Sequence, residues 1–478
     1  MFDASAPVAL FDYFRVPYAT PEGAEPTLVR MNDESRRLNW LRSRHATTLY
    51  WPAWDEEEGR APEFWSLDGT QFFARVAELC GSGLDASLGG SWSRGQTVEG
   101  AGGRVESIWE DNRGNVVLPF DPAEAIESFW SESYRSVEAT GLGGSLRRLA
   151  MRTYYRVRPA LPRSAQISMR RAFSRIQRRR AFPRWPTEPA LHDLYVLLFR
   201  YVAGIAGEPI PSIAPWPSGY TWAVVLTHDV ETSIGYRNLK PLQEIELRAG
   251  YRSSWNFVPK RYEIEDTVVR ELIEQGFEVG VHGLFHDGRD LESEEMVRRR
   301  SPEMRAYAER WGARGFRSPA THRQWDLMPM LGFDYDSSYP DTDPFEPQAG
   351  GCCTWLPYFN RDLVELPITL TQDHTLFVIL RERSERPWIE KASYLRSRQG
   401  MALLITHPDY MRDVASLKAY ERFLSAFSDD SRVWRALPQD VSDWWRRRAA
   451  STIVTDGGTP RVAGPAEREA EIAMLGAD

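Results

Sequence analysis

The stretch Thr221–Glu231, TWAVVLTHDVE, joins a short apolar run to a group of polar side chains. A continuous apolar run of this length is typical of a strand that is buried on both faces of a parallel sheet. Further runs that predict buried strands follow along the chain, and helical patterns such as Thr267–Gln275 lie between them. These runs are Ser253–Val258, Phe277–Val281, Gly315–Ser318 and Met401–Thr406. Strands that alternate with helices predict βαβ units, and therefore an α/β fold with a parallel sheet or barrel.

A proline-rich segment, Glu208–Gly219, precedes this pattern and is typical of a domain boundary. We therefore expect an N-terminal α+β domain over residues 1–215, whose role the sequence does not indicate, and an α/β domain over residues 216–450. The tail, residues 451–478, is rich in Gly, Ala and Glu and is predicted to be disordered. The helices predicted in the first domain are Ala123–Glu138, with Asp121 as its N-cap, and Pro189–Ile205.

The composition is that of an ordinary globular protein, with 478 residues, 42% hydrophobic and 26% charged residues, and a net charge of −8. The longest apolar stretch, Leu194–Ala206, contains Arg200 and is shorter than the ~20 residues that a membrane span needs. The chain begins Met1-Phe2-Asp3, without the basic and apolar regions of a secretory signal. Its three cysteines predict no disulfide framework. We expect a cytoplasmic location, with membrane association left open.

Basic residues are concentrated in one part of the chain. Between Ala139 and Thr187 there are 13 arginines and no acidic residue, so the rest of the chain is strongly acidic. The segment Arg147–Arg184 therefore has two interpretations. It packs on the protein's own acidic surface, or it contacts an anionic membrane surface or a lipid diphosphate. We expect no specific nucleic-acid partner, and the sequence does not indicate the oligomeric state.

Histidines gather after the predicted boundary, where six of the eight occur. Three of them, His228, His282 and His407, stand at the ends of predicted strands, where a parallel sheet or barrel carries its chemistry. His282 and His286 are four residues apart, and on one helical turn they would face the same way and suit one divalent metal. The alternative is two unrelated polar residues on a turn.

Other polar residues follow the same strands. Asp229 and Glu231 come at the end of the first strand, where one carboxylate could bind a metal and the other accept a proton from water. Arg317 could hold a carboxylate in a bidentate pair, and His407 is suited to donating a proton to a leaving group. Taken singly, each has an ordinary explanation. The two acids could mark the start of a helix, Arg317 could be a surface arginine before a turn, and His407 could cap a strand end.

Taken together, the order of these motifs resembles that of polysaccharide deacetylases of the NodB-homology type, carbohydrate esterase family 4. The motifs are Asp229, His282-x3-His286, Arg317-x-Pro319 and Leu404-x-x-His407, and the resemblance spans roughly residues 220–445. It implies a distorted, TIM-like (β/α) barrel with a single metal ion, usually zinc, at its mouth. The metal ligands would then be Glu231, His282 and His286.

The sequence departs from the family pattern at two places. The usual first motif has two adjacent aspartates, whereas Val230 follows Asp229 here and Glu231 becomes the third ligand. Which of Asp229 and Glu231 binds the metal and which acts as the base therefore stays open. The resemblance implies that Arg317 orients the base and that His407 is the general acid. Two further positions are Asp336, expected near the motif that tunes this histidine, and Ala320, which stands where the family usually has an aromatic residue.

The resemblance implies a metal-dependent hydrolase that removes an N-acetyl group from a saccharide. The segments Tyr339–Phe345 and Thr371–His374 resemble those of a subgroup found in bacterial surface-polysaccharide gene clusters. A lipid-linked or nucleotide-linked saccharide would suit a cytoplasmic enzyme. Two alternatives remain: an amide or C–N hydrolase acting on a small non-sugar molecule, and a glycan-binding or assembly protein that has lost turnover.

Overall fold

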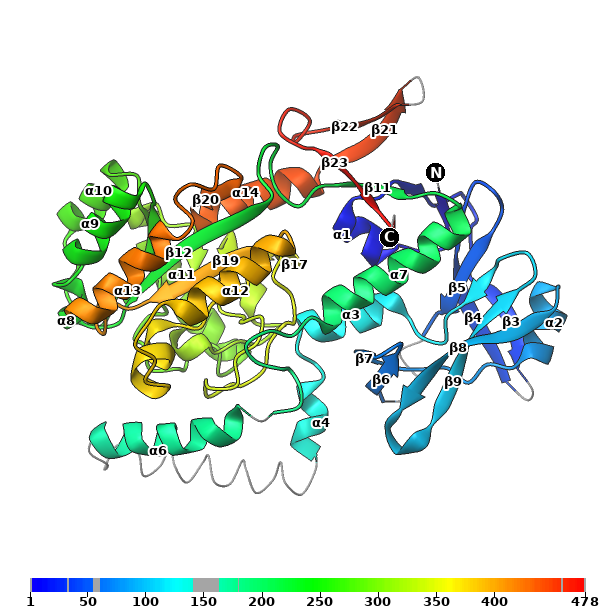
Figure 1. Ribbon diagram of the computed structural model, residues 1–478, viewed down its shortest axis with the longest axis horizontal. Coiled ribbons are helices and arrows are strands. Elements are labelled where there is room, and N and C mark those ends of the chain that lie inside the picture. Colours follow the sequence, from blue (N-terminus) through cyan, green and yellow to red (C-terminus); the bar gives the residue numbers. More distant parts are fainter. Residues whose placement is uncertain are drawn as a thin grey trace. The chain divides into compact units, whose positions relative to one another are not determined.

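The computed structural model describes residues 2–31, 34–54, 61–140, 163–178, 180–456 and 459–476. The chain forms two compact units (Figure 1). The first unit contains Met1–Ser145, Pro189–Ala214 and Arg447–Asp478, and the second contains Leu146–Glu188 and Pro215–Arg446. One crossing between the units, from Ala214 to Pro215, falls within the proline-rich segment. The chain crosses at other places too, which a single boundary near residue 215 did not anticipate.

The second unit is built on a mostly parallel sheet with the strand order β17-β18-β16-β15-β14-β13-β12-β19, and β20 also pairs with β12. Its longest strand, β12, is buried along its whole length, which explains its continuous apolar run. The strands are β12 (Trp222–Val230), β13 (Ser253–Phe257), β14 (Glu278–Val281), β15 (Gly315–Phe316), β16 (Tyr335–Asp336), β17 (Tyr358–Asn360), β18 (Leu363–Glu365), β19 (Met401–Thr406) and β20 (Val433–Ala436).

This sheet is curled but open, so the described strands do not complete the TIM-like barrel that the resemblance implied (Figure 1). After β18 the chain does return to β19, where the backbone N–H groups of Thr369 and Leu370 donate to the carbonyl of Leu403 at 3.2 and 3.0 Å. These two bonds share one acceptor and do not form a ladder. The sheet therefore ends at β17 on one side and β19 on the other.

Helices connect the parallel strands, as the alternating pattern predicted. They are α8 (Ser233–Tyr236), α9 (Lys240–Ala249), α10 (Asp266–Glu274), α11 (Glu294–Trp311), α12 (Arg386–Ser397) and α13 (Val414–Ser425), with α14 (Pro438–Ala449) last. Short helical turns are η3 (Pro319–Thr321), η4 (Met328–Leu331) and the π-helix His374–Ile379. From the arginine-rich segment, helix α6 (Arg163–Gln177) belongs to this unit, whereas residues 147–162 and Arg179 lie outside the described residues.

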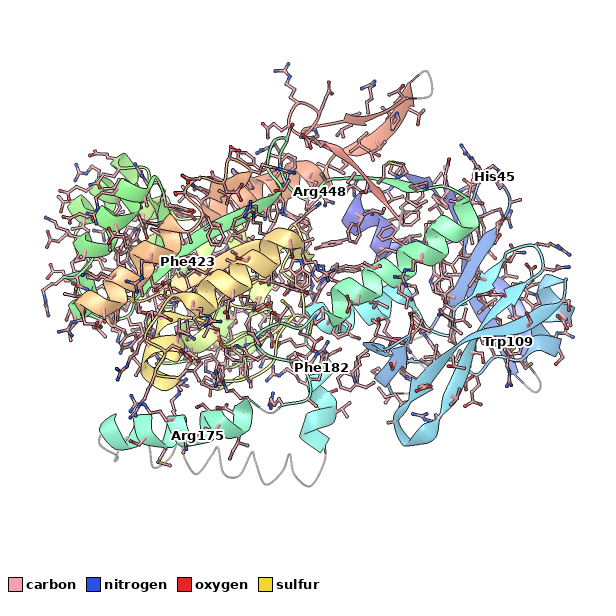
Figure 2. The ribbon with its side chains drawn as sticks, in the orientation of Figure 1. His45, Trp109, Arg175, Phe182, Phe423 and Arg448 are labelled. Carbon is pink, nitrogen blue, oxygen red and sulfur yellow. The ribbon has the colours of Figure 1, made fainter. Side chains whose placement is uncertain are left out.

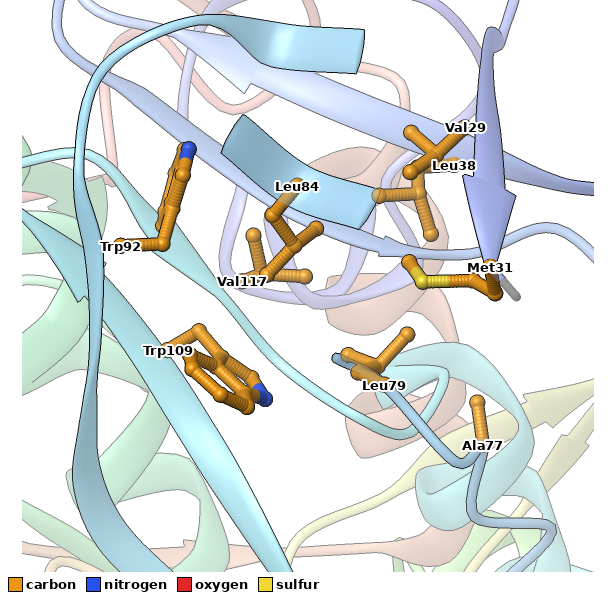
Figure 3. Packing of buried hydrophobic residues seen from close by; sticks show 9 residues of the cluster. All are labelled: Val29, Met31, Leu38, Ala77, Leu79, Leu84, Trp92, Trp109 and Val117. Carbon is orange, nitrogen blue, oxygen red and sulfur yellow. The ribbon is translucent and has the colours of Figure 1, made fainter. Parts of the chain in front are cut away.

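The first unit contains a ten-stranded sheet, mostly antiparallel, in the order β2-β1-β4-β5-β10-β9-β8-β6-β7, with β3 paired to β4. Its strands are β1 (Phe2–Ala4), β2 (Tyr18–Ala19), β3 (Thr27–Met31), β4 (Glu34–Arg42), β5 (Thr48–Pro52), β6 (Glu63–Leu67), β7 (Thr70–Ala74), β8 (Trp92–Gly100), β9 (Val105–Asp111) and β10 (Val116–Val117). One part of its core packs Trp92 and Trp109 around Leu84 and Val117 (Figure 3).

The helices of the first unit agree in part with the sequence. They are α1 (Ala9–Phe14), α2 (Gly81–Leu88), α3 (Pro122–Trp130), α4 (Arg135–Thr140) and α7 (Ala190–Ala206), with a short turn η1 (Ala101–Gly103). The predicted N-cap is confirmed, because Asp121 accepts a hydrogen bond from the backbone N–H of Ala123 at 2.9 Å. The single helix expected over residues 123–138 is divided into α3 and α4. Among the described residues, no helix combines the length and apolar character that crossing a bilayer requires.

The tail was expected to be disordered, and the structure differs. Strands β21 (Thr452–Asp456) and β22 (Thr459–Ala463) form a hairpin, and β23 (Ile472–Leu475) pairs antiparallel with β11 (Ile210–Ile213). Ile453 and Val462 of the hairpin are buried against Ile213. Nearby, the buried guanidinium of Arg448 donates to the carbonyl oxygens of Tyr13, Ile213 and Ala214. The tail is therefore part of the first unit.

Candidate functional site

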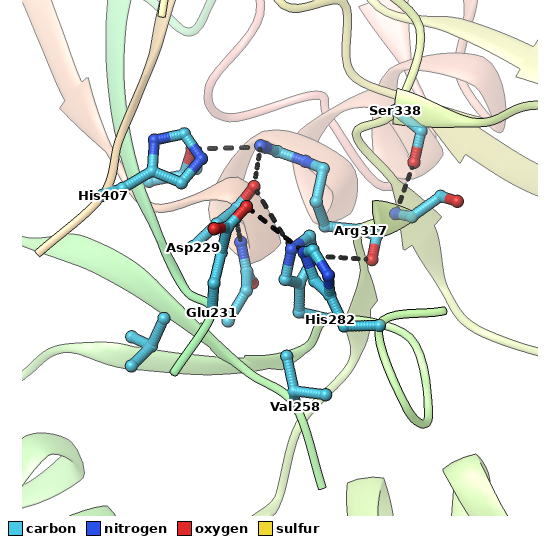
Figure 4. Close-up of polar contacts among 12 residues, drawn as sticks. Asp229, Glu231, Val258, His282, Arg317, Ser338 and His407 are labelled. Carbon is cyan, nitrogen blue, oxygen red and sulfur yellow. Dashed lines mark hydrogen bonds and ion pairs between the residues drawn. The ribbon is translucent and has the colours of Figure 1, made fainter. Parts of the chain in front are cut away.

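Residues at the carboxyl ends of β12, β14, β15 and β19 come together in the second unit (Figure 4). The parallel strands place these ends at one edge of the sheet. Side chains alternate between the two faces of a strand, so Thr227 and Asp229 of β12 share one face and His228 takes the other. Asp229, Glu231, His282, His286, Arg317 and His407 are the predicted site residues found in this region.

His228 stands at a strand end, as predicted, but lies outside this group. Its side chain is fully buried. Nδ1 is 2.7 Å from Thr406 Oγ1 and Nε2 is 2.6 Å from a carboxylate oxygen of Glu246 on α9. Ser253 Oγ donates to the same carboxylate. His228 therefore fixes the sheet to its covering helix.

Three side chains form a group that could hold a metal ion. Glu231, His282 and His286 each offer one ligand atom, and these atoms lie within 4.8 Å of one another. Glu231 Oε1 is 3.2 Å from His286 Nε2. Among the described residues, Nε2 of His282 is buried and has no hydrogen-bond partner. A buried nitrogen of this kind fits a ligand whose metal ion supplies the missing contact.

The protonation of His282 and Glu231 suits the same role. Burial lowers the pKa of His282 to about 4, so its ring is neutral at pH 7. Its Nδ1 lies 3.0 Å from the carbonyl oxygen of Arg317, a contact that orients metal-binding histidines. Burial would raise the pKa of Glu231, but contact with His286 and the nearby His407 lower it well below its ordinary value. Glu231 is therefore a charged carboxylate in the same group as the neutral ring of His282.

A loop, and not the helical turn considered above, brings His286 to His282. Gly283 and His286 have φ of 64° and 57°, and the two imidazole centroids are 5.0 Å apart. A Cβ atom on Gly283 would lie 2.5 Å from Asp290 and 2.7 Å from Pro319, so this position has no room for a side chain. Asp290 also accepts a hydrogen bond from the backbone N–H of Leu284 at 3.2 Å. The loop is thus fixed by close packing.

The loop after β19 holds Glu231 in place. The hydroxyl of Tyr410 donates to Oε2 of Glu231 at 2.8 Å, and the backbone N–H of Glu231 donates to Asp409 at 2.9 Å. Asp409 also accepts from the backbone N–H of Gly235 at 3.2 Å. Sequence reasoning missed Asp409 and Tyr410, although they lie only two and three residues after His407 in the chain. This loop therefore serves the carboxylate as well as the histidine.

Asp229 has a different set of partners. Asn256 Nδ2 donates to Oδ1 at 2.9 Å, and Arg317 Nη1 is 3.3 Å from Oδ2. Burial would raise the pKa of Asp229, but Arg317, His282 and His407 lower it below its ordinary value. Arg317 is only 1% exposed and is held by hydrogen bonds to Thr227 and Ser337. Asp229 is thus a charged carboxylate in a fixed orientation.

His407 is paired with a carboxylate, but this carboxylate is Asp373 and not Asp336. Its Nδ1 lies 2.6 Å from Asp373 Oδ1, and its backbone N–H donates to Oδ2 at 3.0 Å. Burial would lower the pKa of His407, but Asp373, helped by Glu231 and Asp229, raises it to about 10. Its imidazole is therefore protonated at neutral pH and can act as an acid.

Asp336 has other contacts. Its carboxylate accepts hydrogen bonds from the backbone N–H and the hydroxyl of Ser338, both at 2.7 Å. It also stands opposite Glu365 in the register of β16 and β18. The segment Thr371–His374, noted above as a subgroup feature, contains the aspartate that does contact His407.

We expect Asp373→Asn to move the alkaline limit of activity to lower pH. The raised pKa keeps His407 protonated up to about pH 10, and without the carboxylate its burial favours the neutral ring. The pH profile of kcat tests this. Asp336→Asn removes a buried carboxylate without touching His407 and serves as the control. Equal shifts in the two variants would contradict the pairing.

No family model and no curated protein matches this sequence. Among solved structures, one from Mycobacterium smegmatis, described as a polysaccharide deacetylase, is 19% identical and covers 50% of this chain and 96% of its own, with a TM-score of 0.41. A polysaccharide deacetylase structure from Pseudomonas aeruginosa PAO1 is 19% identical and covers 51% and 97%, with a TM-score of 0.41. Puue allantoinase is 17% identical and covers 49% and 93%, with a TM-score of 0.40.

Proposed function

We propose that the second unit is a metal-dependent hydrolase that removes an N-acetyl group from a saccharide. The observation that carries this proposal is the convergence of Glu231, His282 and His286 within 4.8 Å of one another, beside a buried carboxylate and a protonated histidine. The motif order, which resembles that of polysaccharide deacetylases, supplies the substrate class. A lipid-linked or nucleotide-linked intermediate of surface-polysaccharide metabolism is the form we favour.

The donor set fits zinc. Two imidazole nitrogens and one carboxylate oxygen are a common ligand set of catalytic zinc sites, which leave further positions open for water and substrate. The neutral ring of His282 and the charged carboxylate of Glu231 are the forms that bind a metal. When bound, the ion supplies a Lewis acid that polarises the acetamide carbonyl and favours loss of a proton from water.

The chain's own residues then divide the proton transfers. Asp229 takes a proton from the attacking water, whose oxygen bonds to the acyl carbon. Arg317 keeps this carboxylate charged and aimed. His407 gives its proton to the amide nitrogen as the C–N bond breaks, because an unprotonated amine is a very poor leaving group. The products are acetate and a free amino sugar.

The contacts favour Glu231 as the ligand and Asp229 as the base. Glu231 is 3.2 Å from a ligand nitrogen, and Tyr410 holds its other oxygen. Asp229 is 3.9 Å from His282 Nε2 and is held by Asn256 and Arg317. We therefore propose this division of roles for the two carboxylates that the altered first motif left open.

The test is release of acetate from three substrate classes: N-acetylated oligosaccharides, nucleotide-linked N-acetyl sugars and lipid-linked N-acetyl sugars. We expect acetate and a new amine in equal amounts from at least one class, with loss of both after chelation and recovery with zinc. Release from small non-sugar amides alone would favour the alternative hydrolase. Saccharide binding without turnover would favour the binding protein.

A further inference from the structure

One face of helix α6 is fixed to the second unit. Nε and Nη2 of Arg171 donate to the carbonyl oxygen of Val378 at 3.0 and 2.9 Å. Arg170 Nη2 lies 3.3 Å from Glu346 Oε1. Ser174 and Gln177, which share a helix face with Arg170, are buried. The inner face of α6 therefore uses its arginines for internal contacts.

The opposite face of α6 is apolar and basic. Met169 and Ile176, seven residues apart, are 48% and 67% exposed, and Ala172 lies between them on the same side of the helix. Arg175 is exposed beside this stripe (Figure 2). No acidic residue occurs anywhere between positions 139 and 187. Exposed apolar side chains among arginines are the pattern of helices that lie in the surface of a membrane.

The two sequence interpretations of the arginines therefore apply to different faces. Arg170 does pack on the protein's own acidic surface. Among the described residues, Arg175 has no acidic partner. The apolar side chain of Ile176 is exposed, and an acidic residue would not bury it. A nucleic acid would satisfy the charge but would not bury the apolar stripe, whereas an anionic bilayer does both.

We propose that the outer face of α6, made of Met169, Ala172, Arg175 and Ile176, binds the surface of an anionic lipid bilayer. The helix contacts the segment that follows Asp373, the partner of His407. Docking would bring this side of the unit to the lipid headgroups, where a lipid-linked saccharide is presented. This last link rests on the proposed function, whereas the docking itself does not.

The experiment is flotation of the full chain with phosphatidylcholine vesicles, with and without phosphatidylglycerol. We expect flotation only with the anionic lipid, weakened by salt. Ile176→Glu should lower the bound fraction about tenfold, and Met169→Glu should have the same direction of effect. Val414→Glu changes an equally exposed residue (68%) on α13 and should leave flotation intact. Absence of flotation, or equal loss in Val414→Glu, overturns the proposal.

Two further arms separate other anionic ligands and the catalytic proposal. At matched ionic strength, inorganic diphosphate should release no more protein from the vesicles than chloride does. A larger release by diphosphate would assign the arginines to a diphosphate ligand and overturn the bilayer proposal. Failure to bind vesicles, together with duplex-DNA binding that Ile176→Glu leaves unchanged, would assign them to nucleic acid and overturn it as well. His282→Ala protein should float as wild type does, so a failed hydrolase assay and failed docking remain distinguishable.

Discussion

Replacing His282 and His286 together by alanine is expected to remove the bound metal and reduce acetate release more than about a hundredfold, to background. The two rings supply two of the three ligand atoms that lie within 4.8 Å of one another, and a single carboxylate binds zinc weakly. Elemental analysis of protein purified without added metal gives the measurement. We expect about one equivalent per chain in wild type and none in the variant.

The exposed His45 of the first unit provides a matched control, because His45→Ala should keep both metal and activity. Wild-type protein without metal, even after zinc is offered at neutral pH, would contradict the zinc hydrolase. The metal-free amide hydrolase and the glycan-binding protein would then be the hypotheses to pursue.

A comparison of Asp229→Asn with Glu231→Gln should separate base from ligand. Asp229→Asn removes the proton acceptor while keeping the shape of the side chain, so we expect kcat to fall about 10²- to 10⁴-fold with the metal retained. Glu231→Gln removes the charged ligand, so we expect metal content to fall with activity. Both are measured as metal per chain and as acetate released per metal.

The reverse pattern, with metal lost in Asp229→Asn and kept in Glu231→Gln, would exchange the two roles. Asp229→Asn also removes the buried negative charge that faces Arg317, so the melting temperature of this variant should be lower than that of wild type. Metal content is therefore compared on the folded fraction. Asn256→Ala, which removes the other hydrogen bond to Asp229, should lower kcat less and keep the metal.

The sequence predicted those site residues that stand at the carboxyl ends of parallel strands. β12, β14 and β19 carry mostly apolar patterns, and Glu231, His282 and His407, which follow these strands, are found together. The same pattern also selected His228, because a strand end says nothing about which face a side chain takes. Because successive side chains of a strand point to opposite faces, His228 could have been predicted to lie on the face opposite to Asp229.

What the sequence did not predict depends on contacts between distant segments. Asp373 reaches His407 from a loop 34 residues earlier, and no local periodicity marks it. The resemblance implied that Asp336 lies near the motif that tunes His407, whereas in the structure its carboxylate accepts hydrogen bonds from Ser338. The prediction of a disordered tail was wrong for the same reason, because β23 pairs with β11, a strand far earlier in the chain. Composition alone cannot indicate such pairings.

The pairing of β23 with β11 bears on how the protein is produced in the laboratory. Ending the chain after residue 450, as its composition would suggest, removes the strand that covers Ile210–Ile213. The uncovered strand would present a row of unpaired backbone groups together with Ile210 and Ile213, which is a template for aggregation. A shortened protein that precipitates would then say nothing about its catalysis, and an affinity tag is better separated from β23 by a flexible spacer.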